Sequence, residues 1–292
     1  MSSEKNRLPS WKEFQAERES FSWPEGRKVA VIANVAYEAW SDGKVPGIGP
    51  MGNPLPQGAK DTNARSWGNY AKFQGLDRVL RILDRTKVTG SVMVSGILAE
   101  RLPDNVKAIL EAGHEIIGHS WAQDVVPALL DPDADRDNVA KTTQAIEAAT
   151  GVKPKGWASP RSTPSDTTLM SLIDNGYDFH SDAMDADRPY LSHFDNGSIV
   201  SIPFAMDIND LPHSMRWGRS PAQYVEMFDD FLARALKSDD GAIIIDVTVH
   251  PHCYGRPGTA WAYEEVLAKA SARDDIWMPT RAQVVEHFHK TK

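Results

Sequence analysis

The chain has 292 residues, of which 41% are hydrophobic and 25% charged, a balance typical of a folded protein with a large core. Its net charge of −8 disfavours binding to nucleic acid or to an anionic membrane surface. Cys253 is the only cysteine, which excludes an internal disulfide framework and a cysteine-rich zinc site. The first residues hold no apolar run typical of a signal peptide, and no stretch approaches the roughly 20 apolar residues that cross a bilayer. We therefore expect a cytoplasmic protein.

Strands and helices alternate along the chain. A β-branched run over 28–35 predicts a buried strand, a loop rich in Gly and Pro follows over 41–69, and helical spacing of apolar residues predicts a helix over 70–86. The same patterns predict strands at 88–96, 114–120, 153–159, 177–182, 198–206 and 242–250, and helices at 105–113, 133–151, 167–176, 220–238 and 259–272. Repeated β-then-α units predict one α/β domain over 25–292, open or closed into a barrel, after an N-terminal extension over 1–24.

Polar side chains follow the predicted strands, where the chemistry of such folds is usually found. The residues at these strand ends are Asn34, Glu38, His119, Arg161, Asp182, Asn209, Asp210, His250, His252, Cys253 and Arg256. We expect them to face one site.

The segment around His119 begins like a metal site and then departs from one. A histidine four residues after His119 would share its face and complete a ligand pair, but Gln123 stands there. Glutamine is a poor zinc ligand compared with imidazole.

Five segments carry a resemblance to a known family. "LEAGHEIIGHSWAQD", "GWASPRSTPS", "DNGYDFHSDAMDADRPY", "SIPFAMDINDLPH" and "VTVHPHCYGRPG" resemble, in this order, motifs of the polysaccharide deacetylase family. They are most similar to the branch of bacterial allantoinase-type and cyclic imide-hydrolysing proteins. The resemblance spans roughly residues 25 to 290. It implies a distorted (β/α) barrel of the NodB-like type, hydrolysis of a non-peptide C–N bond, and a homo-oligomer, dimer or tetramer.

Most ligands of the family's usual metal site are replaced in this chain. The metal-dependent members resembled here carry two acidic residues on the first strand and an H-x-x-x-H pair after the third. Mapped onto this sequence, these positions are Asn34, Ala36, His119 and Gln123. The family's ion is held by two imidazoles and one carboxylate, and only His119 remains of these three ligands. Alanine has no atom that can bind a metal.

The first interpretation is metal-free opening of a small cyclic amide, a ureide such as allantoin or a cyclic imide. Glu38 or His119 would take a proton from water, Arg161 or a backbone amide would stabilise the oxyanion, and His250 would protonate the leaving nitrogen. The residues assigned to substrate binding are Asn34, Gln123, Trp121, Trp157, Asp182, Asn209, Asp210 and Arg256. For the two tryptophans, stacking on a planar ring and plain packing both remain open.

Other interpretations compete. A relocated metal, most simply zinc, would be bound by Glu38, His119, His250 and His252, although residues two apart on a strand point to opposite faces. A metal-dependent glycan deacetylase and a protein that only binds a small molecule are the further alternatives. Arg161 could instead pair with Asp182, and Asp210 could cap the segment after its strand.

Overall fold

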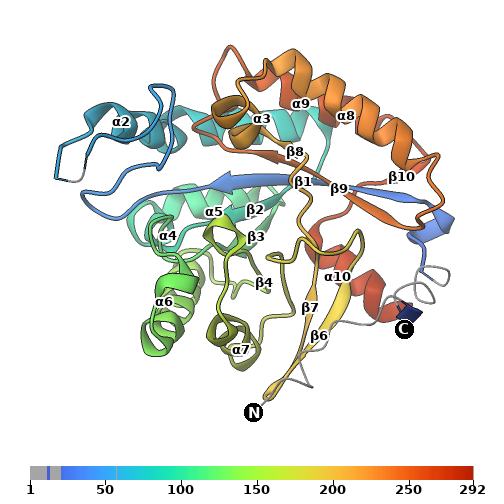
Figure 1. The fold of residues 1–292 in the computed structure, drawn as a ribbon, viewed down its shortest axis with the longest axis horizontal. Helices are drawn as coiled ribbons and strands as arrows, with labels where there is room; N and C mark the ends of the chain where they lie inside the picture. The colour runs from blue at the N-terminus through green and yellow to red at the C-terminus, as the bar shows by residue number, and fades with distance from the viewer. Residues whose placement is uncertain (1–11, 14–20, 57, 292) are drawn as a thin grey trace.

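The computed structural model describes residues 12–13, 21–56 and 58–291, so most of the predicted extension over 1–24 lies outside the described residues. Parallel strands form a central sheet with helices packed around it (Figure 1). The strands are β1 (Val29–Tyr37), β2 (Ser91–Val94), β3 (Glu115–Gly118), β4 (Gly156–Trp157), β5 (Phe179–His180), β6 (Tyr190–Phe194), β7 (Gly197–Ser201), β8 (Ile208–Asn209), β9 (Ile243–Val249) and β10 (Ile276–Trp277). The predicted α/β class is confirmed.

The sheet has the strand order β6-β7-β5-β4-β3-β2-β1-β9-β8, with β10 paired to β1. Only the β6–β7 hairpin is antiparallel among the pairings of the described strands. The two ends of this ladder are not joined by strand pairing in the described chain. A backbone hydrogen bond joins the segment before β6 to β9 instead, from the Ile244 N–H to the Asp187 carbonyl at 2.9 Å. The sheet thus resembles a barrel whose two end strands, β6 and β8, are not paired with each other.

Helices α3, α8 and α9 lie on one side of the sheet and α4 to α7 on another (Figure 1). The helices are α2 (Thr62–Tyr70), α3 (Leu76–Thr86), α4 (Gly96–Arg101), α5 (Pro103–Glu111), α6 (Pro132–Thr150), α7 (Asp166–Asp174), α8 (Pro221–Ala235), α9 (Ala260–Ser271) and α10 (Arg281–Lys290). The loop predicted over 41–69 is wrong in its last part, because a helix begins at Thr62. Asp61 caps it by accepting a hydrogen bond from the Ala64 N–H at 2.8 Å. A five-residue π-helical turn, Ala71–Gly75, joins α2 to α3.

Alternating residues of β1 point to opposite faces of the sheet and pack into two different hydrophobic clusters. Val31 and Val35 pack with the surrounding helices, whereas Ala30 and Ile32 belong to an inner cluster. Ile117 from β3, Phe179 from β5, and Val284 and Phe288 from α10 share this inner cluster. Because inward residues from distant strands meet in one core, the sheet must curve around it. Such a strand is buried on both faces, which explains the continuous apolar run in its sequence.

A buried ion pair closes the inner core. Arg281 of α10 contacts Asp246 of β9 and donates from Nε to the Asn34 side-chain oxygen at 3.2 Å. Asn34 in turn donates to Asp246 at 2.6 Å, and all three side chains are fully buried. The prediction that Asn34 reads a substrate is therefore wrong, because its amide is committed to this network. The candidate site begins past the end of β1, at Glu38.

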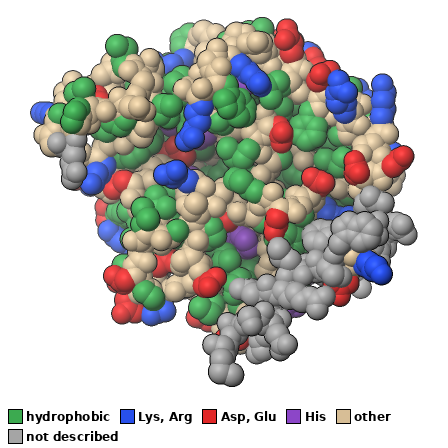
Figure 2. Space-filling model, in the orientation of Figure 1, with side chains coloured by type: hydrophobic (Ala, Val, Ile, Leu, Met, Phe, Trp, Pro, Cys, Tyr) green, Lys and Arg blue, Asp and Glu red, His purple; other side chains and the backbone are tan. Residues whose placement is uncertain are grey.

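No helix among the described residues is long and apolar enough to cross a membrane. Acidic and basic side chains are interspersed over the visible face rather than gathered by sign (Figure 2).

Candidate active site

Glu38 lies one residue beyond β1, and two histidines from other strand ends face its carboxylate. Its Oε1 is 3.3 Å from Nε2 of His119, which follows β3, and 3.5 Å from Nε2 of His250, which follows β9. The three residues are only 7%, 5% and 6% exposed. The topology brings β1 between β2 and β9, so residues far apart in sequence meet at one edge of the sheet.

The hydrogen bond at Nδ1 of His119 determines which of its two ring nitrogens faces Glu38. Its Nδ1 is 2.5 Å from the carbonyl oxygen of Ala158, which can only accept, so Nδ1 carries a proton. The backbone N–H of His119 donates to the Val94 carbonyl at 3.0 Å, which fixes the start of the loop after β3. Nε2 is consequently presented to the Glu38 carboxylate.

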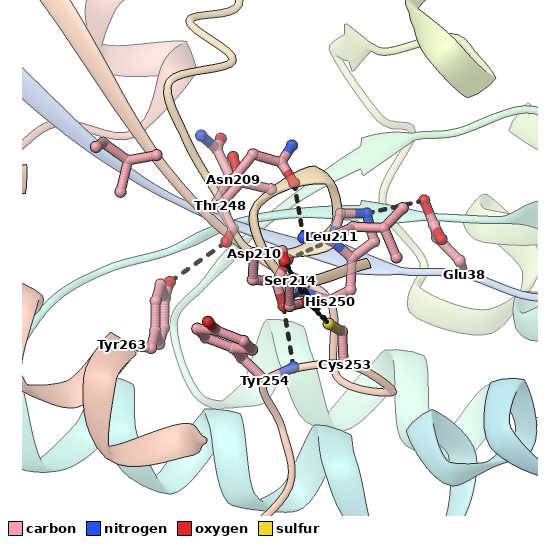
Figure 3. Close-up of polar contacts among 12 residues, drawn as sticks. Glu38, Asn209, Asp210, Leu211, Ser214, Thr248, His250, Cys253, Tyr254 and Tyr263 are labelled. Carbon is pink, nitrogen blue, oxygen red and sulfur yellow. Dashed lines mark hydrogen bonds and ion pairs between the residues drawn. The ribbon is translucent and has the colours of Figure 1, made fainter. Parts of the chain in front are cut away.

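His250 is held from the opposite side by Asp210 (Figure 3). The Asp210 Oδ1 lies 2.6 Å from His250 Nδ1, and its Oδ2 accepts from the backbone N–H groups of His250 and Tyr254 at 2.8 and 3.0 Å. Burial alone would lower the pKa of His250, but the carboxylates of Glu38 and Asp210 raise it to about 10. Burial likewise opposes ionisation of Glu38, yet His250 and His119 hold the Glu38 pKa well below its usual range. The resting pair is therefore a carboxylate and an imidazolium.

Asp182 lies near His119 but makes its contacts elsewhere. It accepts from the backbone N–H of Ser159 at 2.6 Å and from the Ser159 hydroxyl at 2.8 Å. Burial raises its pKa to about 6, although these hydrogen bonds and the charge of His119 oppose the shift. Its partner is thus Ser159 and not Arg161, which was the alternative expected from the sequence.

His252 lies against His250, with ring centroids 5.6 Å apart. The turn that begins at Pro251 ends the strand, so the two histidines do not point to opposite faces as strand geometry predicts. Trp67 and Trp40 contact the His252 ring edge-on, at centroid distances of 4.5 and 5.6 Å. Burial lowers the pKa of His252 to about 3, although the charge of Glu38 acts the other way. Its buried Nδ1 has no hydrogen-bond partner among the described residues.

Gln123 follows His119 on the same loop, and its side chain is available for a ligand. Its backbone N–H donates to the carbonyl of Ala39, the neighbour of Glu38, at 2.9 Å. Its side-chain Nε2 is buried and has no partner within the described chain. A buried donor without a partner is costly, so it marks a position where a bound molecule can contribute the missing acceptor.

Other predicted residues lie outside this group. Trp157 is fully buried, donates from Nε1 to Ser159, and packs edge-on against Tyr177. Trp121 faces α6, where Lys141 lies 3.4 Å above its ring beside a surface hollow of about 550 Å³. The prediction that Trp157 stacks on a substrate ring is therefore wrong, because its ring is fully buried in packing. The prediction for Trp121, which lines the surface hollow, stays a prediction.

The last three predicted residues have different surroundings. Arg161 is exposed on a turn after β4, with a left-handed φ of 62°, and its predicted role at the oxyanion stays a prediction. Asn209 accepts from the Leu211 N–H at 3.2 Å and so acts as a turn cap. Arg256 donates to the His252 carbonyl and stacks on Tyr70.

The side chains present do not fit the metal site expected from the resemblance. Ala36 offers no ligand atom, and an amide occupies position 123. In the described chain, no group of three or more His, Cys, Asp or Glu side chains is arranged to hold a metal ion. We therefore derive no chemical step through a metal.

Residues 71–180 match the sequence pattern of the polysaccharide deacetylase family. A Schizosaccharomyces pombe protein assigned to the polysaccharide deacetylases is 24% identical, over 90% of this chain and 91% of its own length. The chain carries a polysaccharide deacetylase domain.

Two solved structures have a similar fold. A Mycobacterium smegmatis protein assigned to the polysaccharide deacetylases superposes with a TM-score of 0.78, at 29% identity and 93% coverage of both chains. Puue allantoinase superposes with a TM-score of 0.80, at 21% identity, over 92% of this chain and 93% of the other. At that identity the second likeness shows the fold alone.

Sequence reasoning missed two features of the candidate site. Trp40 and Trp67, which enclose His252, stand at either end of the Gly/Pro-rich segment, and the sequence carries no sign that they meet. Ser159 was not selected as the partner of Asp182, because the two residues lie 23 positions apart in the sequence.

Proposed function

We propose that this protein is a hydrolase that opens a small cyclic amide, a ureide or a cyclic imide, without the metal ligands usual for its family. The observation that carries the proposal is the buried Glu38 carboxylate between Nε2 of His119 and Nε2 of His250. Puue allantoinase, whose name describes a hydrolase of a cyclic ureide, has the same fold.

Glu38 is the proposed base. The oxygen of a water molecule bonds to the ring carbonyl carbon while Glu38 takes one of its protons. A carboxylate with a lowered pKa is a weak base. We therefore expect a bound ring to loosen the Glu38–His250 contact and so raise the Glu38 pKa. Gln123 Nε2, a buried donor without a described partner, is suited to hold the developing oxyanion.

His250 is the proposed acid. As the C–N bond breaks, the Nε2 proton of His250 moves to the leaving nitrogen, and the products are a carboxyl group and an opened amide or urea. Glu38 then returns its proton to His250 across the 3.5 Å contact, which restores the resting pair. Asp210 keeps the imidazole oriented throughout, because it binds both Nδ1 and the backbone of His250.

A metal-dependent deacetylase is the second candidate, and one observation favours it. Each histidine beside Glu38 has its Nδ1 bonded to an oxygen, Ala158 for His119 and Asp210 for His250. Histidines that bind metals usually show this arrangement. A cation would have to displace the Nε2 proton of His250.

Ring opening by metal-stripped protein tests the two candidates. Allantoin, hydantoin, succinimide and glutarimide are offered to chelator-treated protein, with and without added zinc. We expect turnover without zinc and a loss of about 10²- to 10⁴-fold in Glu38→Gln, because proton transfer by a positioned group contributes that much. Glu111→Gln, an exposed glutamate of α5, is the matched control.

The remaining outcomes decide against the proposal. Turnover only with zinc supports the metal-dependent candidate, and activity on acetylated sugars alone supports a deacetylase. Full activity of Glu38→Gln would contradict the assignment of the base.

A further inference from the structure

The loop from His250 to Gly258 folds back on itself next to the site. A Cβ on Gly255 would lie 2.2 Å from the Pro251 carbonyl oxygen, and the Gly255 N–H points to the His250 carbonyl at 3.4 Å. This close approach requires a glycine. It places the next residue, Arg256, beside His252, to whose carbonyl the Arg256 Nε donates at 3.0 Å.

One face of α2 supports this loop. Trp67 and Tyr70 are one helical turn apart, and they contact His252 and Arg256 respectively. The Arg256 guanidinium carbon lies 4.1 Å from the centre of the Tyr70 ring, a cation–π contact. Trp67 and Tyr70 thus form a wall beside the loop. Arg78 holds this wall in place by donating to the Tyr70 hydroxyl at 2.8 Å and to the Gly255 carbonyl at 2.5 Å. The plane of the Arg256 guanidinium is therefore fixed.

Arg256 and His252, which pack against this wall, retain unused hydrogen-bonding groups. Arg256 is half-buried, and no carboxylate in the described part of the chain forms an ion pair with it. Its Nε is used, so the N–H groups of its two terminal nitrogens remain for another acceptor. His252 Nδ1 is buried without a described partner. A fixed guanidinium fork with free terminal N–H groups matches a carboxylate.

We propose that Arg256 forms a specificity subsite for a carboxylate on the substrate, so that the preferred substrate is an anionic cyclic amide. This inference rests on the proposed ring-opening function and narrows its substrate class. The ring binds at Glu38, His119 and His250, and its carboxylate is bound by Arg256 on the Tyr70 face. Arg256 makes no contact with the reacting atoms.

A purely structural role of Arg256 would give a different result. If the arginine only fixed the loop, its loss would lower activity on charged and neutral rings equally. If it binds a carboxylate, its loss lowers kcat/KM for the charged ring alone. The experiment therefore compares rings that differ by one carboxylate: dihydrouracil with dihydroorotate, and hydantoin with hydantoin-5-acetate.

Each ring is tested by turnover and by calorimetric binding to the wild type, Arg256→Gln, Arg256→Lys and Arg219→Gln. Arg219 is the matched control, an exposed arginine that also stacks on an aromatic ring, 5.0 Å from the centre of Trp217. We expect the wild type to prefer the carboxylated member of each pair by about 10- to 100-fold, as for a hydrogen-bonded charged pair. Arg256→Gln abolishes this preference, Arg256→Lys retains part of it, and Arg219→Gln leaves it unchanged.

The readouts separate this inference from the proposed function. Arg256-dependent binding of the carboxylated rings without any turnover would uphold the subsite and contradict ring opening. Turnover of neutral and charged rings at equal rates, with both falling together in Arg256→Gln, would overturn the subsite and leave ring opening intact. Absence of both binding and turnover for the carboxylated rings would also overturn the subsite.

Discussion

Asp210 holds His250 through both of its carboxylate oxygens, one on the imidazole Nδ1 at 2.6 Å and the other on the backbone N–H at 2.8 Å. Side chain and backbone of the same residue are thus fixed by one buried group. A single rotation of the imidazole away from Glu38 would break the first contact only. The arrangement therefore defines both the position of His250 and which of its nitrogens faces the substrate.

Replacing Asp210 by Asn should disable His250 more than it disturbs the fold. An amide retains one acceptor but places an NH₂ group against an N–H of His250, and it removes a charge that raises the His250 pKa. We expect about a 10²-fold or greater loss in kcat, with the alkaline limb of the pH–rate profile shifted to lower pH. We expect about 1–3 kcal/mol of lost stability. Steady-state kinetics across pH and chemical denaturation measure the two effects.

Asp133→Asn on the exposed start of α6 is the control for this change. An unshifted pH–rate profile in Asp210→Asn would contradict a role for Asp210 in setting the His250 pKa.

The free energy of unfolding should fall as the solution becomes alkaline. The folded pKa of His250 is about 10 and its ordinary value is 6.5. The stabilisation from its protonation is therefore fully present below 6.5 and is lost as pH rises toward 10. The slope for one proton is at most about 1.4 kcal/mol per pH unit. Urea denaturation at several pH values in this window measures it.

His250→Gln provides the comparison, because it removes the titrating group. We expect the slope between the two pKa values to be smaller in this variant than in the wild type, whatever its absolute stability. Equal slopes would show that His250 does not titrate in this window.

Gln123→His should create a metal site beside Glu38 and His119. The substitution restores the imidazole spacing that the sequence lacks, and Glu38 already supplies a carboxylate at 3.3 Å from His119. We expect zinc affinity to rise by at least about 10-fold over the wild type, since one added ligand raises the ligand number toward that of typical zinc sites. Isothermal titration with zinc measures this affinity. Combining the change with His119→Ala should remove the gain, and a gain that survives would show that zinc binds elsewhere.

Gly75→Ala should displace the loop after His250, although Gly75 itself lies outside the site. A Cβ at Gly75 would lie 2.1 Å from the Pro251 carbonyl oxygen, so the π-helical turn and the loop after His250 must separate. We expect a loss of about 1–3 kcal/mol in stability, as for other overpacked positions, together with a lower kcat. Gly47→Ala, where a Cβ would meet no atom within 4 Å, is the control. If Gly75→Ala matches Gly47→Ala in both thermal unfolding and kcat, the close contact does not position His250.

Much of the architecture follows from local sequence patterns. The apolar run of β1, the capped helix α6 and the alternation of strands with helices predict an α/β domain, because they depend on side-chain periodicity alone. Glu38, His119 and His250 are predicted as site residues since each follows a strand, and parallel strands deliver their carboxyl ends to one edge of a sheet.

The tertiary structure decides which strand-end residues belong together. Asn34 lies on the same strand face as Glu38, yet the distant Arg281 and Asp246 take up its amide. Trp157 follows the pattern of a site residue but is covered by Tyr177. Such partners come from segments far away in sequence, and no local pattern encodes them. The sequence by itself determines the fold class and the Glu38, His119 and His250 positions. Only long-range packing decides their hydrogen bonds, their protonation and the wall that carries Arg256.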